Sequence, residues 1–140
     1  MTTASEPTIT RFAIGTKVVV ERRIEVVDID RFANFSGDTS AIHMDSATAI
    51  ARGFTGRVAH GMLLAAWVSS IVGTKLPGDC GVLQSSNFAF RAPVVPPDVL
   101  TITIEVAGKS ESVAQLKLAV TVVRSDGVVA MTGDLRSIVK

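Results

Sequence analysis

In the C-terminal half of the chain, apolar and polar residues alternate with a period of two. Leu100–Val106 alternates apolar residues with Thr and Glu, and Leu116–Val122 alternates them with Lys, Ala and Thr. This period predicts two half-buried strands. The turn residues Ser125-Asp126-Gly127 predict a tight hairpin into a third strand over Val128–Val139. A further strand is expected upstream, over Val82–Phe90.

The N-terminal half is less regular. A Val-rich segment from Lys17 to about Val27 predicts one strand. Asp28 is expected to cap a short helical turn that runs through Phe32 to Phe35. Ser46 is expected to cap another short helix, Ala47–Arg52, which Gly53 ends.

Between the two halves lies a segment without a polar face. The run MLLAAWVSSIV, residues 62–72, places apolar side chains on nearly every side of a helix. A helix that is apolar all round is a buried helix, so we expect a sheet to wrap it. Few of the expected strands are separated by helices, which favours a largely antiparallel sheet. The order of elements is that of an α+β hotdog fold, a curled antiparallel sheet around a long central helix.

Composition supports a strand-rich chain that associates with itself. The sequence holds 20 Val, 10 Ile and 13 Thr against 8 Leu, and β-branched side chains favour strands. The mean hydropathy of +0.41 is high for a small chain with much unavoidable surface. We therefore expect a homodimer or a larger homo-oligomer that buries an apolar face.

Charge and special residues exclude several classes of protein. With 14 Lys and Arg against 13 Asp and Glu, the chain lacks the excess of basic residues that a nucleic-acid-binding module needs. Cys80 is the single cysteine and there are two histidines, so we expect no disulfide and no metal site. The longest apolar run is too short to cross a membrane, and no secretory signal is found, so a cytoplasmic protein is expected. We expect a flexible tail over residues 1–15 and one domain over residues 16–140.

Asp38 and His43 are the first candidates for chemistry. Both lie in a glycine-containing turn, where two polar groups can point into one cavity. A carboxylate and an imidazole beside one water form an acid–base pair that can accelerate proton transfer. The alternative is structural: Asp38 caps a turn and His43 packs on a surface loop.

Other candidates surround the central helix. Gly61 begins it, so its backbone N–H could stabilise an oxyanion, or the glycine could serve only a tight entry to the helix. Ser69 could hold a polar side chain or bond back to a carbonyl one turn earlier. His60 could be a hydrogen-bond donor at the helix entry or a second acid–base group. Arg91 could meet a phosphate or serve solubility alone.

Several motifs in order resemble one family. These are FSGDTSAIHMD at residues 35–45, RVAHGML at 57–63, LPG at 76–78 and FAFRAPV at 88–94. Together they resemble the MaoC-like (R)-specific enoyl-CoA hydratases, from about Val20 to the C-terminus. One departure is Ser40-Ala41, where the family has Asn-Pro. Because proline restricts its own φ and its neighbour, this change predicts a looser turn before His43.

The resemblance implies a hotdog dimer with an acyl tunnel near the subunit interface. It implies that Asp38 and His43 are the catalytic dyad, that the Gly61 N–H holds the thioester carbonyl oxygen, and that Ser69 helps to hold the aspartate. Met62, Trp67 and Arg91 are the further candidates for substrate contact. Leu83 and Phe88 are expected to help Met62 and Trp67 close the tunnel.

The reaction implied is the reversible hydration of a trans-2-enoyl thioester, carried on CoA or acyl carrier protein, to an (R)-3-hydroxyacyl thioester. No metal or redox cofactor is expected. Two alternatives stay open at this point. One is a hotdog thioesterase, in which water attacks the carbonyl carbon. The other is a non-catalytic subunit that binds acyl thioesters, which would need neither Asp38 nor His43.

Overall fold

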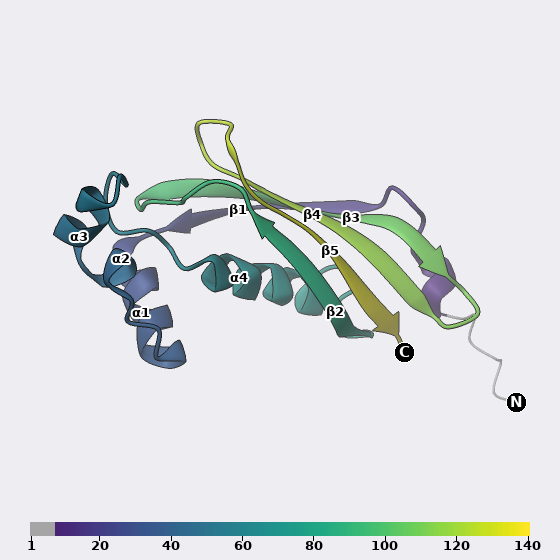
Figure 1. Cartoon of the computed structure of the whole chain (residues 1–140). Helices are drawn as coiled ribbons and strands as arrows, with labels where there is room; N and C mark the ends of the chain where they lie inside the picture. The colour runs from purple at the N-terminus through teal and green to yellow at the C-terminus, as the bar shows by residue number, and fades with distance from the viewer. Residues whose placement is uncertain (1–7) are drawn as a thin grey trace, which may run out of the picture.

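Five strands dominate the computed structural model, which describes residues 8–140. They form one antiparallel sheet in the order β1-β3-β4-β5-β2. The strands are β1 (Lys17–Ile24), β2 (Gly81–Phe90), β3 (Asp98–Ser110), β4 (Gln115–Val123) and β5 (Val129–Val139). The long helix α4 (Gly61–Thr74) lies along one face of this curved sheet (Figure 1). The α+β hotdog fold expected from the sequence is thus confirmed.

The alternating segments form the inner face of the sheet. Ile102 on β3 lies opposite Val122 on β4, and Ile104 lies opposite Val120, with all four side chains buried. Burying a side chain of this size contributes roughly 1.5–3 kcal/mol. The helix adds to the same core Leu63, Leu64, Trp67, Val68, Ile71 and Val72. Packing of these residues fixes α4 against the sheet.

One face of α4 differs from the expectation that the helix is buried on all sides. Met62 is 59% exposed. The residues that follow it on the same face are exposed too: Ala66, Ser69, Ser70 and Gly73. In the single chain the sheet covers only the other faces of the helix. Small residues such as Ala, Ser and Gly occur on both buried and open faces. The hydrophobic pattern of the sequence therefore could not show that this side of α4, its exposed stripe, is open.

The first strand is shorter than expected, because helix α1 (Val26–Ser36) begins early. Glu25 caps this helix, and the expectation that Asp28 is the cap is wrong. The Glu25 N–H donates to the Asp28 carboxylate at 2.8 Å, so Asp28 acts from the third helical position as part of a capping box. Gly37 ends α1 at a φ of 79°, which favours glycine.

Two short helices follow, α2 (Ala41–Met44) and α3 (Ser46–Ala51). With α1 they gather beyond the start of α4, at the end of the molecule opposite the C-terminus (Figure 1). Asp45, not Ser46, caps α3, because its carboxylate accepts hydrogen bonds from the Thr48 amide and hydroxyl. The expected cap was therefore placed one residue too late.

The N-terminal tail is shorter than expected. Residues 1–7 lie outside the described part of the chain, but Thr8–Arg11 form a 3₁₀ helix. Ile9 in this turn is buried, and Phe12 packs against the core. The expectation of a flexible tail is therefore wrong for residues 8–15. An apolar side chain within a polar segment was the signal that could have shown this.

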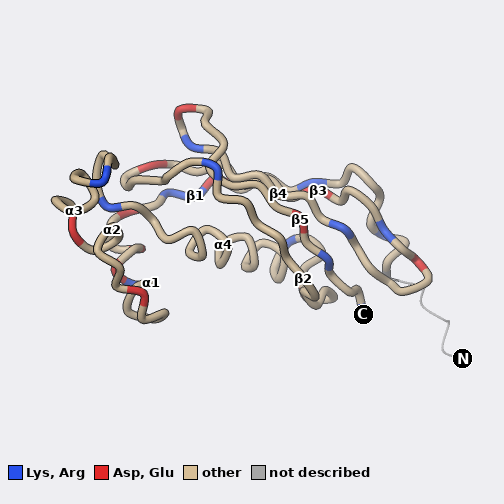
Figure 2. Tube along the Cα trace, in the orientation of Figure 1, with Lys and Arg blue, Asp and Glu red and all other residues tan. Residues whose placement is uncertain are grey.

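Charged residues are spread over the strands, α1 and the loops, and no element gathers one sign along its whole length (Figure 2). Within residues 8–140, none of the helices combines the length and the apolar character needed to pass through a membrane.

Candidate active site

Asp38 and His43 lie side by side beyond the start of α4. Asp38 follows the C-cap of α1, while His43 lies on α2, a single helical turn rather than the loop expected from the sequence. The His43 Nε2 atom is 3.9 Å from the Asp38 Oδ2 atom. The Asp38 side chain is 47% exposed and that of His43 is 12% exposed. The imidazole is therefore fixed inside the protein, while the carboxylate faces the surroundings.

Two hydrogen bonds fix the orientation of His43. Its Nδ1 atom is 2.6 Å from the carbonyl oxygen of Val58. Because a carbonyl oxygen can only accept, Nδ1 carries a proton and donates it. The Arg57 Nε–H donates to the His43 carbonyl oxygen at 2.5 Å, and the same guanidinium pairs with Asp30 of α1. In the neutral imidazole these contacts leave Nε2 with a free lone pair toward Asp38.

Hydrogen bonds from Ser40 define the state of the Asp38 carboxylate. The Ser40 hydroxyl donates to Asp38 Oδ1 at 2.5 Å, and the Ser40 N–H donates to the same oxygen at 3.1 Å. These bonds stabilise the charged form, the hydroxyl more than the amide, and lower the pKa of Asp38 below its ordinary value. The carboxylate is therefore ionised at neutral pH, and Oδ2 is left as the acceptor nearest to His43.

Ser40 and Ala41, where the family has Asn-Pro, do not leave the turn unsupported. Ser40 binds the Asp38 carboxylate, and Ala41 begins α2 with its carbonyl accepting from the Asp45 N–H at 2.8 Å. Arg57 adds a third link through the His43 carbonyl. The spacing between Asp38 and His43 is thus held by side-chain hydrogen bonds in place of a proline ring.

A pH profile tests the link between Ser40 and Asp38. A carboxylate base is active above its pKa, so activity is lost as the pH falls through that pKa. Replacing Ser40 with alanine removes the hydroxyl bond and raises the pKa of Asp38. We expect the acid limb of kcat/KM to move to higher pH in Ser40→Ala, while Ser46→Ala, an exposed serine on α3, keeps the wild-type profile. An unchanged limb in Ser40→Ala would contradict this role for the hydroxyl.

Gly61 places a free amide beside this pair. It is the first residue of α4, after the N-cap His60, so its N–H has no partner within the helix. None of the hydrogen bonds among the described residues uses this N–H. The positive end of the helix dipole reinforces it. The amide is therefore suited to receive a developing negative charge, and its role as an oxyanion donor stays a prediction.

Gly61 has no side chain, and this leaves room for the ring of Phe90. A Cβ atom here would lie 2.6 Å from the ring of Phe90. Phe90 is half exposed, so its ring can swing aside without unfolding the chain. We expect Gly61→Ala to fold but to lower kcat/KM by about 10²-fold, because the new methyl group and the displaced Phe90 ring move the carbonyl away from the N–H, which alanine retains. Steady-state kinetics with thermal melting measure both effects.

Gly73→Ala is the matched control for this variant. Gly73 lies on the exposed stripe of the same helix, and a Cβ there would meet no atom within 4 Å. It should keep wild-type turnover and gain up to about 1 kcal/mol of stability from helix propensity. Equal kinetics for the two alanine variants would remove Gly61 from the site.

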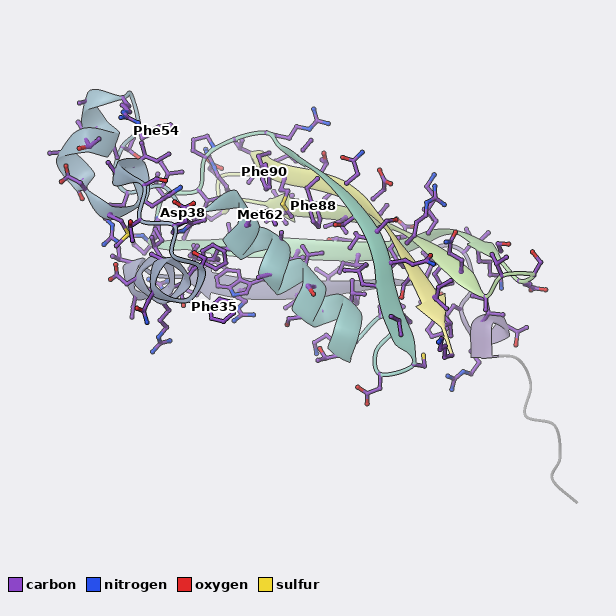
Figure 3. The ribbon with its side chains drawn as sticks, turned by 60° about the horizontal axis from the view of Figure 1, so that its bottom comes forward. Phe35, Asp38, Phe54, Met62, Phe88 and Phe90 are labelled. Carbon is purple, nitrogen blue, oxygen red and sulfur yellow. The ribbon has the colours of Figure 1, made fainter. Side chains whose placement is uncertain are left out.

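Met62 lines two apolar pockets on the open side of the molecule. The amide pocket, about 410 Å³, includes Gly61, Phe90 and Arg91. The groove pocket, about 290 Å³, runs between α4 and β2 and is lined by Phe32, Met62, Ala65, Ala66, Ser69, Leu83, Ser86, Phe88 and Leu135. Figure 3 shows Asp38, Met62, Phe88 and Phe90 around the start of α4 on this side. Met62, Leu83, Phe88 and Arg91 therefore line pockets, and their contact with substrate stays a prediction.

Trp67 and Ser69 are the remaining two candidates on α4. Trp67 is buried in the core, and the Arg22 guanidinium lies 4.1 Å from the centre of its ring. It lines neither the amide pocket nor the groove pocket but another one beside Arg22 and Phe32, and its contact with substrate stays a prediction. Ser69 lies on the exposed stripe of α4 and lines the groove pocket. Among the described residues, no hydrogen bond joins Ser69 to Asp38, whose carboxylate is held by Ser40 instead.

The structure places His60, for which the sequence left two roles open, in contact with His43 and Asp38. Potential ligand atoms of Asp38, His43 and His60 all lie within 4.8 Å of one another. The two imidazole rings are stacked rather than convergent, and His43 Nδ1 and His60 Nε2 already face backbone carbonyl oxygens. These three residues therefore do not fit a metal ion as they stand. His60 belongs to the site through contacts with the other two residues.

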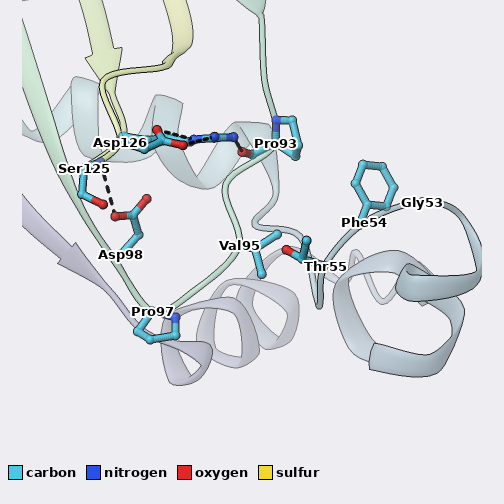
Figure 4. Close-up of a pocket in the computed structure, with 10 residues that line it drawn as sticks. Gly53, Phe54, Thr55, Pro93, Val95, Pro97, Asp98, Ser125 and Asp126 are labelled. Atoms are coloured by element: carbon cyan, nitrogen blue, oxygen red, sulfur yellow. Dashed lines mark hydrogen bonds and ion pairs between the residues drawn. The ribbon is translucent and has the colours of Figure 1, made fainter.

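A third pocket, of about 360 Å³, lies apart from these residues (Figure 4). Its charged groups already pair with each other: the Arg124 guanidinium binds the Asp126 carboxylate and donates to the Pro93 carbonyl at 2.9 Å. Asp98 accepts from the amides of Val99 and Ser125. No catalytic constellation is formed in this pocket.

The sequence of the chain is similar to the sequences of proteins that are named as enzymes. The family model "MaoC like domain" matches residues 10–128. The chain is 34% identical over 116 residues to a 3-hydroxybutyryl-CoA dehydratase of Methylorubrum extorquens, covering 83% of this chain and 74% of that protein. It is 30% identical over 121 residues to an (R)-specific enoyl-CoA hydratase of Aeromonas caviae, covering 86% and 90%.

The solved structures agree with the sequence comparison. The (R)-hydratase from Aeromonas caviae, described as involved in PHA biosynthesis, superposes with a TM-score of 0.88 at 28% identity. The match covers 92% of this chain and 98% of the hydratase.

Proposed function

Since the chain belongs to the MaoC-like domain family, we propose that it is a lyase for the reversible hydration of a trans-2-enoyl thioester to an (R)-3-hydroxyacyl thioester. One observation carries the proposal beyond the resemblance. An ionised carboxylate and an imidazole lone pair face each other 3.9 Å apart, beside a helix N-terminus with a free amide. A subunit that only binds thioesters needs no such pair.

The separation of the two acceptors suits one water molecule. At 3.9 Å, His43 Nε2 and Asp38 Oδ2 are too far apart for a direct hydrogen bond. Two hydrogen bonds of about 2.8 Å from a single water oxygen span this distance at an angle near 90°. Such a water donates one proton to each acceptor, and its lone pairs then face the substrate.

The reaction follows from this placement. The water oxygen forms a bond to the β-carbon while one O–H bond breaks, and its proton passes to the dyad formed by His43 and Asp38. The electrons of the double bond move toward the thioester carbonyl oxygen, where the Gly61 N–H stabilises the charge. The charge then returns as the α-carbon accepts a proton from the dyad, which restores the starting state of the dyad and completes the addition of water. Dehydration is the same sequence in reverse.

The two pockets lined by Met62 offer the binding surface. We place the thioester carbonyl at Gly61, with its carrier arm in the amide pocket near Arg91. The acyl chain then lies in the groove pocket, whose lining is mostly apolar. The linings of the two pockets do not include Asp38 or His43, and the link to the dyad is the His60 ring, which contacts Phe32 of the groove pocket and stacks on His43.

A direct assay tests the proposal. Purified protein is mixed with crotonyl-CoA in the presence of EDTA, because the proposed reaction needs no metal or redox cofactor. Absorbance of the conjugated double bond and release of free thiol are followed separately. Loss of the double bond without thiol supports hydration. Release of thiol would identify a thioesterase, and a bound but unchanged substrate would identify a binding subunit.

We further propose that the functional unit is a homodimer formed along β2. This strand is one of the two edge strands of the sheet, with its side chains exposed over most of its length. The exposed stripe of α4 lies beside it, and Phe35 and Phe90 are also exposed on this side of the molecule (Figure 3). A second copy that pairs its own β2 edge would cover these apolar groups and remove the open edge.

A pair of lysine variants tests this interface. Val82 on β2 and Val113 on the turn between β3 and β4 are both more than half exposed. A charge on an edge strand opposes pairing, so we expect Val82→Lys to shift the protein to monomer in sedimentation velocity. Val113→Lys should remain dimeric. A monomeric wild type, or a dimer in both variants, would contradict the proposed interface.

A further inference from the structure

His60 contacts both Asp38 and His43 and directly precedes Gly61. It is the N-cap residue of α4 and precedes Gly61, yet its side chain is only 2% exposed. Its Nε2 atom is 2.9 Å from the carbonyl oxygen of Asp38, a residue 22 positions earlier in the chain. A buried polar side chain with a long-range bond to the catalytic turn does more than cap a helix.

The ring of His60 also controls the plane of His43. The two imidazoles are stacked, with centroids 3.9 Å apart and planes 25° apart. Phe32 packs against the same His60 ring at 4.8 Å and closes the far side. The Val58 carbonyl fixes rotation of His43 within its own plane, and the His60 ring fixes the plane itself.

The hydrogen-bond partners of His60 define its tautomer. The Asp38 carbonyl can only accept, so His60 carries a proton on Nε2. Its Nδ1 atom is buried and has no hydrogen-bond partner among the described residues. The nitrogen that faces the catalytic turn is therefore already engaged as a donor, while the unpaired Nδ1 is buried.

We propose that His60 is a positioning residue that holds the Asp38 backbone and the His43 ring at the separation that one shared water requires. The proposal rests on the hydration function given above and decides between the two roles that the sequence left open for His60. The stack and the hydrogen bond act together: one sets the imidazole plane, and the other sets the position of the carboxylate segment. Misplacement of reacting groups by about 1 Å can cost on the order of 10²-fold in rate.

Two substitutions separate these contributions. His60→Gln can still donate to the Asp38 carbonyl but has no ring, whereas His60→Phe keeps a ring against His43 but has no donor. We expect each to lower kcat for crotonyl-CoA at least about 10-fold with little change in KM, because neither touches the substrate. Ile71→Ala removes a buried side chain from the same helix and is the control for stability loss. It should lower the melting temperature without this loss of kcat.

Nitrogen NMR gives a readout that does not depend on activity. The chain has two histidines, so ¹⁵N-histidine labelling yields two pairs of ring signals, one Nδ1 and one Nε2 for each imidazole, assigned by the His60 variants. We expect the proton on Nδ1 of His43 and on Nε2 of His60. The ring signals of His43 should shift in both His60 variants and stay in place in Ile71→Ala.

The outcomes separate this proposal from the function on which it rests. Folded His60→Gln and His60→Phe proteins with wild-type kcat and unchanged His43 signals would overturn the positioning role while leaving hydration intact. A His60 proton on Nδ1 would overturn it as well. A wild type that does not hydrate crotonyl-CoA would contradict the proposed function, and the NMR shifts of His43 would still test the coupling between the two rings.

Discussion

Asp38→Asn is expected to lower kcat for hydration of crotonyl-CoA by about 10²–10⁴-fold, the range for losing a positioned proton-transfer group. Asparagine keeps the shape of the side chain and an oxygen that can accept from Ser40. It replaces the anionic Oδ2 atom, the acceptor that faces His43, with a neutral donor or acceptor. The shared water then loses one of its two anchors, and the dyad loses its negative charge.

Asp45→Asn is the matched control. Asp45 is also an exposed aspartate, and hydrogen bonds from the Thr48 hydroxyl and amide lower its pKa in the same way. It caps α3 and takes no part in the dyad. Its asparagine variant should keep wild-type kcat. Loss of activity in both variants would show that the effect comes from disturbed local structure and not from the dyad, and full activity of Asp38→Asn would remove Asp38 from the mechanism.

His43→Asn is expected to lower kcat by at least about 10²-fold while the protein stays folded. The asparagine amide nitrogen reaches roughly the position of Nδ1, so it can still donate to the Val58 carbonyl. It has no atom at the position of Nε2, where the imidazole presents its lone pair toward Asp38. Steady-state kinetics and circular dichroism measure activity and fold together.

His43→Ala separates the two roles of this side chain. If the lone pair on Nε2 is what matters, the alanine and asparagine variants lose activity to a similar extent. If the bond to Val58 matters more, His43→Asn keeps most of the activity and His43→Ala loses it. Turnover of His43→Asn within a few-fold of the wild type would therefore show that His43 is not the proton acceptor.

The strands could be predicted well because their signal is local. The alternation over Leu100–Val106 and Leu116–Val122 lies within β3 and β4 of the structure. The caps were harder, since Asp28 and Ser46 are good capping residues but Glu25 and Asp45 precede them and take that role. Which of two neighbouring polar residues caps a helix depends on the path of the chain, and that path is set by packing.

Residues of the site could be predicted from the sequence where they lie in the motifs that resemble the family. Asp38 and His43 lie 3.9 Å apart, and Gly61 follows His60, whose ring stacks on His43, because all of them sit in short motifs of fixed spacing. Their catalytic roles stay predictions. Ser69 does not reach Asp38 within the chain, and Trp67 is used in the core. A local motif cannot distinguish the buried from the exposed side of an apolar helix when the exposed side is made of small residues.

Contacts between segments that are distant in the sequence also hold His43 in place, and the motifs do not show these contacts. The bond from Arg57 to the His43 carbonyl and the stack of His60 on His43 join residues 14 and 17 positions apart, and no periodicity predicts either. They explain how the turn keeps its geometry with Ser40 and Ala41 in place of Asn-Pro. The sequence indicated a looser turn because the supporting side chains come from other segments.

Hydration carried out in ¹⁸O-labelled water tests most directly whether Asp38 and His43 deliver a water to the β-carbon. The product of crotonyl-CoA is analysed by mass spectrometry and by chiral chromatography. We predict an intact thioester with the label in its C3 hydroxyl group and the (R) configuration. Label in a free carboxylate, or no label transfer by the folded wild-type protein, would contradict the account.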